Sequence, residues 1–326
     1  MTKDLDPGPE HGTEERKPLV DRPRRTGDRV FRWATVATAS FVLLALGLMV
    51  VSTTISSRTV FQSQGIIGFL TGMRWVPGES IYGALPFIYG TVVTAIIAVI
   101  VGVPISILIA LYLSEVAPRR VAGPVSYLVD LLAAIPSVVY ALWGVFVFVP
   151  WVLKPVQDFL ATYLGWSRIF EGPVFGLSYL STGLVLSIMI VPIVSAICRE
   201  VFATVPPGEK EAALALGATR WEMIRLSVLP RSRAGIIGGV MLGLGRALGE
   251  TIVAALLIGS QVDIHVSVLQ PGYTMAAVIA NQFQEAGAEQ IRALLGVGVV
   301  LFVITIIVNI IARLIVARTS TPRGAT

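Results

Sequence analysis

Two residues of opposite charge stand four positions apart inside a long apolar stretch of this sequence. They are Arg246 and Glu250, in the segment Gly-Leu-Gly-Arg-Ala-Leu-Gly-Glu at 243–250. A charge at the middle of a membrane-spanning helix costs about 2.5–3.5 kcal/mol on insertion scales, so such residues usually face other helices or an aqueous path. Residues four apart share one helix face, where an arginine and a glutamate can pair.

Two roles are open for this pair. It could be a structural ion pair that fixes helix register. Alternatively, Arg246 attracts an anion along a translocation path and Glu250 orients it, because a guanidinium fork matches two oxygens of a tetrahedral oxyanion. Glycines every four residues would let another helix pack closely, so the charges are expected at a helix–helix seam rather than facing lipid. These glycines are Gly235, Gly239 and Gly243.

A second segment, between two apolar stretches, is polar and suited to helix formation. The strong helix formers of 211–216 are followed by Gly217, which fits a C-terminal helix cap with positive φ. Thr219 and Glu222 have the capping-box spacing that opens a second helix, and Pro230 is expected to end that helix. The sequence therefore predicts a helix–glycine–helix loop.

Such a loop is suited to binding a soluble partner. Small alanines allow close approach, and an exposed Trp221 could anchor a partner's pocket. The other interpretation is an amphipathic connector that rests on the lipid head groups. The residues expected to meet the partner are Glu211, Ala212, Ala213, Gly217 and Trp221.

The composition indicates a polytopic membrane protein. Of 326 residues, 55% are hydrophobic and 14% are charged, and the mean hydropathy is +0.79; soluble domains carry about 25% charged residues. One cysteine, Cys198, excludes an intrachain disulfide, and two isolated histidines give no basis for a His/Cys metal cluster. The chain is expected to lie in membrane lipid and to bind no nucleic acid.

Six apolar runs are long enough to span a bilayer, so the predicted class is all-α with six transmembrane helices. The runs are roughly 33–52, 86–113, 124–150, 179–198, 234–259 and 292–316. Asp130 in the third run is a weaker candidate for the translocation path; the favoured interpretation is a packing or interface role near the cytoplasmic end. The predicted division is a disordered tail 1–32, a first span 33–52, an outer loop 53–85, a core 86–316 with five spans and the loop 199–233, and a tail 317–326.

The basic residues predict the orientation. Nineteen Lys and Arg lie in the N-terminal tail, the loops 114–123 and 199–233 and the C-terminus, against five in the other loops. Because cytoplasmic loops carry the excess of Lys and Arg, both termini and the loop 199–233 are expected in the cytoplasm. In the outer loop 260–291, residues 274–286 have helical spacing that suggests a short interfacial helix; a plain loop is the alternative.

No nucleotide site of the P-loop type is present, because none of the four lysines follows a glycine. The chain is therefore expected to bind no cofactor and to be no enzyme, with any ATP and Mg²⁺ on a partner.

The segment Glu211-Ala212-Ala213, followed by Gly217 and ending in Leu229-Pro230, resembles the EAA loop of ABC importer permeases. The resemblance implies a type I ABC importer (MetI-like) permease fold, in which this loop is the coupling helix that docks on a cytoplasmic ATPase subunit.

Further motifs narrow the resemblance. The segment 243–250, Ala-Ala-Ile-Pro-Ser-Val-Val-Tyr at 133–140, Pro-Gly-Tyr-Thr at 271–274 and Ile-Ala-Asn at 279–281 are together similar to PstC-type permeases of phosphate-specific ABC importers. This implies phosphate passage at Arg246 and Glu250 in a bacterial inner (plasma) membrane protein. It implies three partners: a second permease (PstA-like), an ATPase dimer (PstB-like) and an extracytoplasmic phosphate-binding protein (PstS-like). The alternatives are a permease of this fold for another oxyanion or solute, and a secondary transporter or membrane scaffold.

Overall fold

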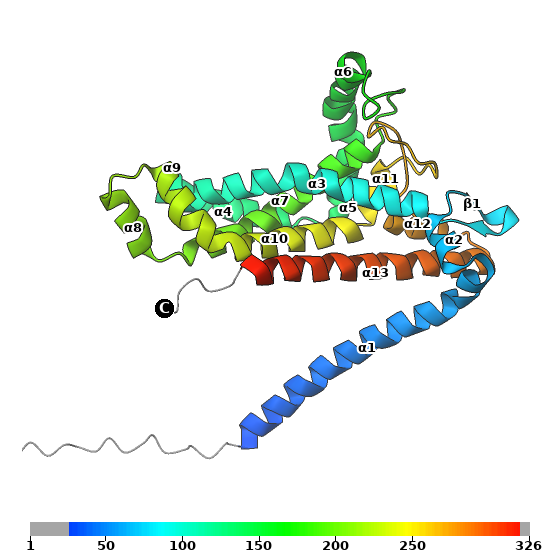
Figure 1. Cartoon of the computed structure of the whole chain (residues 1–326), viewed down its shortest axis with the longest axis horizontal. Coiled ribbons are helices and arrows are strands. Elements are labelled where there is room, and N and C mark those ends of the chain that lie inside the picture. The colour runs from blue at the N-terminus through cyan, green and yellow to red at the C-terminus, as the bar shows by residue number, and fades with distance from the viewer. Residues whose placement is uncertain (1–25, 320–326) are drawn as a thin grey trace, which may run out of the picture. The chain divides into compact units, whose positions relative to one another are not determined.

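The first described helix begins earlier than the sequence predicts. The computed structural model describes residues 26–319, with side chains from 27 to 315, and divides into two parts after Val51. The described residues of the first part all belong to helix α1 (Thr26–Gln64), which continues into the second part (Figure 1). Residues 26–32 of the predicted disordered tail are therefore helical, and the rest of that tail lies outside the described residues.

The second part is mostly helical, in agreement with the predicted class, apart from one hairpin in which Trp75 pairs with Tyr82 and Val76 with Ile81. Three of its helices, η2, η3 and η4, have π geometry, and η1 is a 3₁₀ turn. The elements after α1 are α2 (Ile66–Thr71), β1 (Trp75–Val76), η1 (Pro77–Glu79), β2 (Ile81–Tyr82), α3 (Leu85–Leu111), η2 (Tyr112–Val116), α4 (Arg119–Ala134), α5 (Ser137–Trp143), η3 (Gly144–Leu153), α6 (Lys154–Leu164), α7 (Tyr179–Ala203), α8 (Pro207–Ala215), α9 (Arg220–Met223), η4 (Ile224–Val228), α10 (Leu229–Gly249), α11 (Ile252–Leu257), α12 (Met275–Gln282) and α13 (Ala288–Thr319).

Five helical segments of the described chain are long and apolar enough to cross a membrane. Each overlaps one of the predicted apolar runs, so the chain is a multi-pass membrane protein. The remaining predicted run, 234–259, is not one continuous helix. The five segments are Gly27–Gln64, Leu85–Val116, Ser137–Leu164, Tyr179–Ala203 and Ala288–Ile315.

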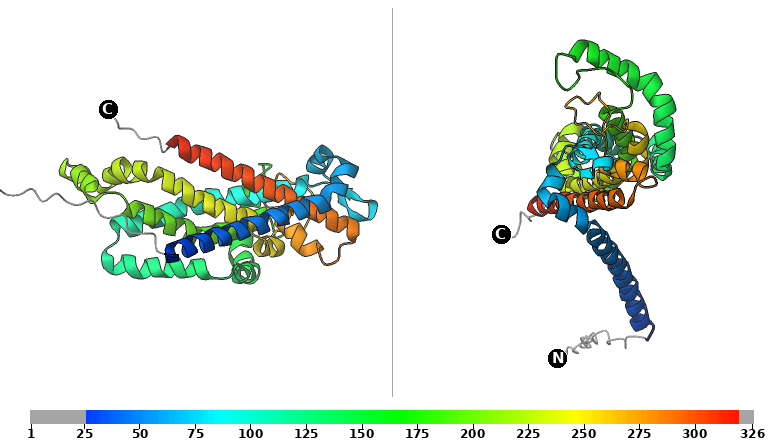
Figure 2. Two further views of the ribbon diagram at one scale, coloured as in Figure 1. Left: turned by 90° about the horizontal axis from the view of Figure 1, so that it is seen from below. Right: turned by 90° about the vertical axis from the view of Figure 1, so that its right-hand side faces the viewer.

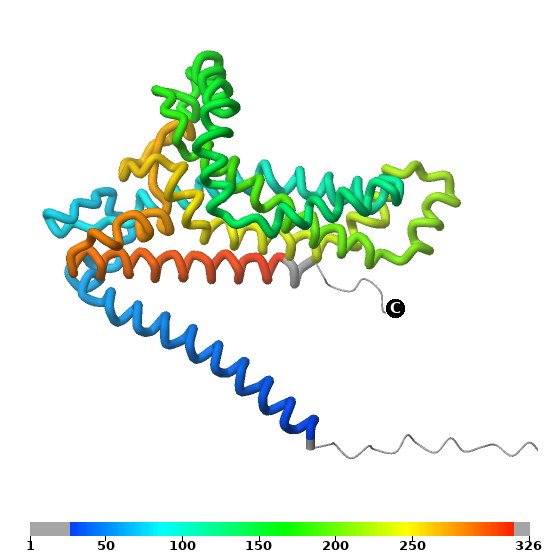
Figure 3. Tube along the Cα trace, turned by 180° about the vertical axis from the view of Figure 1, so that it is seen from behind, coloured from blue at the N-terminus to red at the C-terminus, as the bar shows by residue number. Residues whose placement is uncertain are grey.

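The third predicted run, 124–150, is wrong in its extent. Helix α4 ends at Ala134, and Ile135 is extended with ψ 128°. The break precedes Pro136, which has no N–H to donate and which excludes helical backbone at the residue before it. Helix α4 is therefore a separate element with no buried residue, and the spanning segment starts at Ser137. It bends within η3, so that α6 points away from the direction of α3 and α7 (Figure 3).

The fifth predicted run is broken as well, without a proline. Helix α10 ends at Gly249, Glu250 is extended with ψ 120°, and α11 begins only at Ile252. Glycines at 243, 245 and 249 lower the helix propensity of this stretch, because glycine loses more backbone freedom on folding than other residues. Arg246 consequently lies in the last turn of a helix, not at the middle of one.

Helices α3, α7, α10 and α13 run side by side, with α7 packed on both α3 and α10, and α13 packed on α10 (Figures 1 and 2). The predicted glycine ridge of α10 faces α7. Cβ atoms built at Gly235, Gly239 and Gly243 would stand 2.4, 3.1 and 2.7 Å from side-chain atoms of α7. The ridge is therefore a close helix–helix seam, as the spacing predicts.

An aromatic cluster closes the end of the stack where α3 begins. Trp75 makes edge contacts with Tyr82 and Phe87, with ring centroids 5.0 Å apart in both pairs, and Phe87 contacts Tyr273 at 5.7 Å. The helix expected within 274–286 is present as α12, capped by the Thr274 hydroxyl. Its first turn is buried in this cluster, so α12 is part of the core rather than a helix lying on the membrane surface.

We expect Gly243→Ala to destabilise the folded chain and Gly238→Ala to leave it unchanged or slightly more stable. A methyl group at 243 would stand 2.7 Å from Val194 Cγ2, and overpacking of this kind costs about 1–3 kcal/mol. At 238 a Cβ meets nothing within 4 Å, and alanine gains about 1 kcal/mol over glycine in helix propensity. Thermal unfolding of the detergent-solubilised protein measures both variants, and equal midpoints would contradict the close seam.

Candidate functional site

The loop between α7 and α10 has the predicted helix–glycine–helix shape. Helix α8 ends in two backbone hydrogen bonds: Gly217 N donates to Leu214 O at 3.0 Å, and Ala218 N donates to Ala213 O at 3.2 Å. This is the Schellman arrangement, which requires a left-handed residue after the helix. Gly217 supplies it with φ +87°, so the predicted glycine cap is confirmed.

The predicted capping box is also present. The Thr219 hydroxyl accepts from Glu222 N at 3.3 Å, and Glu222 Oε2 accepts from Thr219 N at 2.8 Å. The bonds from the backbone N–H and the hydroxyl of Thr219 hold the pKa of the Glu222 carboxyl below its ordinary value. Because the pKa is lowered, the box stabilises the folded loop at neutral pH, and this contribution is lost as the pH falls through the lowered value.

The expected end of the second loop helix at Pro230 is wrong. Helix α9 continues through the π turns of η4 into α10, and Pro230 occupies the first turn of α10. A π turn absorbs the missing proline N–H without ending the helix, because it changes which carbonyls need a donor. The loop is therefore joined to Arg246 by uninterrupted helix.

The outer face of the loop is apolar and exposed. Leu216 is 89% exposed and Trp221 59% exposed, whereas Met223 and Ile224 on the other face are buried in the core. Of the expected docking residues, Glu211, Ala212, Gly217 and Trp221 are exposed and Ala213 is half-buried. Large exposed apolar side chains on a polar loop are typical of a protein contact site.

Asp130 pairs with Arg199, whose guanidinium donates to Asp130 Oδ1. This ion pair joins α4 to the end of α7. It agrees with the packing role expected for Asp130, although Asp130 lies on α4 and not in a spanning segment.

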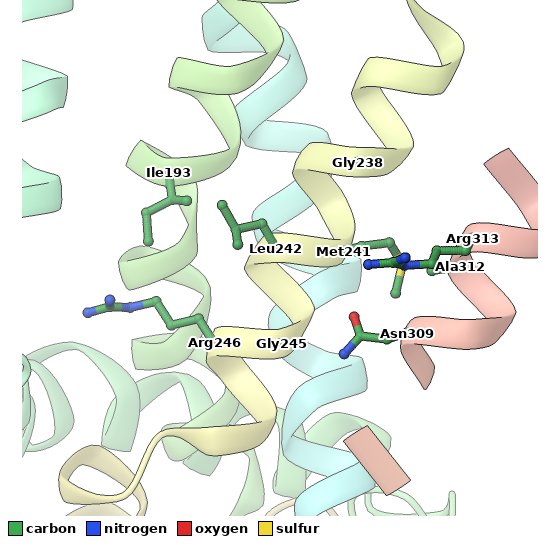
Figure 4. Close-up of a pocket in the computed structure, with 9 residues that line it drawn as sticks. All are labelled: Ile193, Gly238, Met241, Leu242, Gly245, Arg246, Asn309, Ala312 and Arg313. Carbon is green, nitrogen blue, oxygen red and sulfur yellow. The ribbon is translucent and has the colours of Figure 1, made fainter. Parts of the chain in front are cut away.

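Arg246 lines a groove of about 770 Å³ between α7, α10 and α13. In Figure 4 the Arg246 side chain extends from α10 on the side of α7, whereas Arg313 and Asn309 of α13 approach α10 from its other side. The Arg246 side chain is exposed in the single chain. The lining residues are Ile193, Gly238, Met241, Leu242, Gly245, Arg246, Asn309, Ala312 and Arg313.

Arg246 and Glu250 do not form the ion pair that their spacing suggests. No salt bridge joins them among the described side chains. The reason is the break after Gly249: Glu250 has left the helix, so the four-residue spacing no longer places the two side chains on one face. No carboxylate of the described residues therefore accepts hydrogen bonds from the Arg246 guanidinium.

The residue that sequence reasoning missed is Tyr140. It lies in α5, and its side chain is buried. Its hydroxyl donates to Leu132 O at 2.9 Å, across the break between α4 and α5. The described residues hold no group of three metal-ligating side chains.

The sequence matches a family model described as "Binding-protein-dependent transport system inner membrane component" over residues 102–321. Curated relatives cover nearly the whole chain. Phosphate transport system permease protein PstC of Xylella fastidiosa is 46% identical over 301 residues, 91% of this chain and 93% of the relative. The protein of the same name from Haemophilus influenzae is 41% identical, over 91% of this chain and 95% of the relative. PstC 2 of Mycobacterium tuberculosis is 38% identical, over 90% and 93%.

Solved structures share the fold. A chain of a bacterial alginate ABC transporter, in complex with its alginate pentasaccharide-bound periplasmic protein, matches with a TM-score of 0.61 and 19% identity, over 92% of this chain and 99% of that chain. A chain of the inward-facing MetNI methionine ABC transporter matches with a TM-score of 0.51 and 17% identity, over 73% and 95%. These likenesses confirm the predicted fold of ABC importer permeases. The chain belongs to the family of inner membrane components of binding-protein-dependent transport systems and, within it, to the PstC permease proteins.

Proposed function

We propose that this chain is the permease subunit of an ATP-driven importer of inorganic phosphate. The structural observation that carries the proposal is Arg246, an exposed guanidinium that borders a groove and has no carboxylate partner among the described residues. Its planar donor fork suits a tetrahedral oxyanion. The relatives that cover about nine tenths of the chain are named for phosphate transport, which selects phosphate among such anions. We also assign Glu250 to this path, as a polar residue in the extended segment after α10.

An ABC importer permease acts with an ATPase and a binding protein and is a transport component, not an enzyme. For this chain we assign an ATPase dimer (PstB-like) that binds ATP and Mg²⁺, a second permease (PstA-like) and an extracytoplasmic phosphate-binding protein (PstS-like). Both termini and the loop 199–233 lie in the cytoplasm, as the charge count predicts. The broken segment α10–α11 serves as a sixth span, because the bundle and the partner permease cover its freed backbone groups.

The continuous helix suggests how an ATPase docked on the loop changes the position of Arg246. The ATPase holds the exposed face of α8 and α9, including Leu216 and Trp221. When ATP closes the ATPase dimer, it moves this loop, and the continuous helix α9–η4–α10 carries the movement to Arg246. Moving the arginine relative to the second permease opens the path to one side of the membrane at a time.

We expect Arg246→Gln to lower phosphate uptake by the reconstituted complex at least about tenfold, with the complex still assembled and hydrolysing ATP. A hydrogen bond to a charged group contributes about 1.5–3 kcal/mol, and about 1.4 kcal/mol corresponds to a factor of ten. The measurement is uptake of labelled phosphate into proteoliposomes, with sulfate and molybdate as competitors.

The matched control is Arg120→Gln, since Arg120 is exposed at the start of α4 and does not line this groove. We expect this variant to keep uptake within about threefold, because one lost surface charge away from the groove changes only the general potential. Normal uptake by the Arg246→Gln variant would mean that Arg246 has only a structural role. Stronger uptake of sulfate or molybdate than of phosphate would mean that the transported anion is not phosphate.

We expect Gly217→Val to reduce co-purification of the ATPase subunit. A side chain at φ +87° is strained, at roughly 1–2 kcal/mol for the left-handed region and more for a β-branched residue, so the cap that positions α8 against α9 opens. Gly208→Ala is the control, because a Cβ there meets nothing within 4 Å and its φ is ordinary. Quantitative pull-down of the ATPase with both variants checks this, and equal recovery would argue against docking at this loop.

A further inference from the structure

The docking loop has a second attachment to the membrane helices, besides its continuity with α10. We propose that the buried ion pair between Lys210 of α8 and Glu115 of η2 is the joint through which the docked loop moves α3. Lys210 is then a positioning residue for transport. The inference rests on the proposed function, since it names the residues that connect ATPase docking to the spanning helices.

The contacts of Lys210 reach the ends of two spanning segments. Its Nζ donates to Glu115 Oε1 at 2.6 Å and to Phe202 O at 3.5 Å. Glu115 lies in the last π turns of the segment Leu85–Val116, and Phe202 lies at the end of α7. One ammonium group in the first turn of α8 therefore holds the docking helix to α3 and to α7.

Burial separates this pair from an ordinary surface ion pair. The Glu115 side chain is 6% exposed and that of Lys210 21% exposed. Charges shielded from water attract each other more strongly and are costly to separate, because each would be left without a partner. A second pair on the same turn, Glu209 with Arg231 at 2.8 Å, is 40% and 58% exposed, and exposed pairs contribute little.

The position of Glu115 suits the transfer of movement. Helix η2 follows α3 without a break, and the chain then turns at Ala117, which is extended, into α4. Glu115 is thus fixed to the end of a long rigid helix. Without the pair, α8 would have no charged contact with η2 among the described residues. Movement of α8 would then reach α3 only through the apolar packing of α7 and the core.

The test removes both charges, so that neither remains buried and unpaired. The double variant Lys210→Met with Glu115→Gln keeps the size of both side chains. We expect the reconstituted complex to assemble and hydrolyse ATP, but to import at least tenfold less phosphate per ATP hydrolysed. The charge-exchanged variant, Lys210→Glu with Glu115→Lys, is expected to recover at least a third of the wild-type ratio. The control Arg231→Gln, which breaks the exposed pair, is expected to stay within twofold.

Two results would overturn the inference. One is a wild-type ratio of phosphate to ATP in the double variant; the other is loss of the ATPase subunit from the complex, which would assign the pair to docking or folding. If the wild-type complex imports no phosphate, the proposed function fails instead. Amide hydrogen exchange of residues 211–215 then tests the joint independently of cargo: we expect at least tenfold faster exchange in the double variant, and unchanged exchange would reject the joint.

Discussion

The lipid interior provides no water for unpaired backbone groups, and the structure of the candidate path follows from this constraint. Irregular backbone at membrane depth is stable only where protein covers it or where it lines a water-filled space. The chain interrupts two apolar runs, after Ala134 and after Gly249. At the first break the Tyr140 hydroxyl donates to the Leu132 carbonyl, and the second break follows the helical turn that carries Arg246. Polar side chains thus lie beside both interruptions of the apolar runs.

The same stretch of chain connects this region with the cytoplasmic loop. Because η4 accommodates Pro230 within a helix, residues from Arg220 to Gly249 form one continuous rod. Its glycine ridge lies against α7 at contact distance, so the rod cannot tilt without moving or sliding past α7. Packed helices of this kind move as units rather than deform continuously. A displacement of α9 would therefore move the helix that carries Arg246.

Local chemistry explains which features the sequence predicts. The cap at Gly217, the box of Thr219 and Glu222, and the glycine ridge depend on residues a few positions apart, so their patterns are readable along the chain. The break at Glu250 has no proline to signal it, and the predicted pair with Arg246 fails for that reason. Contacts such as Lys210 with Glu115, 95 positions apart, depend on how α3, α7 and α8 pack, which spacing does not encode.

Both proposed functional surfaces are exposed in the single chain, as expected of surfaces that partners cover. A guanidinium in an apolar run of a membrane protein is costly unless it faces water, an anion or another protein, yet Arg246 is exposed on the isolated chain. Leu216 and Trp221 expose apolar area that a monomer would normally bury. Trp221 and Arg246 lie near opposite ends of the rod α9–η4–α10. A partner that binds the loop would therefore act on the same helix that carries Arg246, the residue proposed for the anion path.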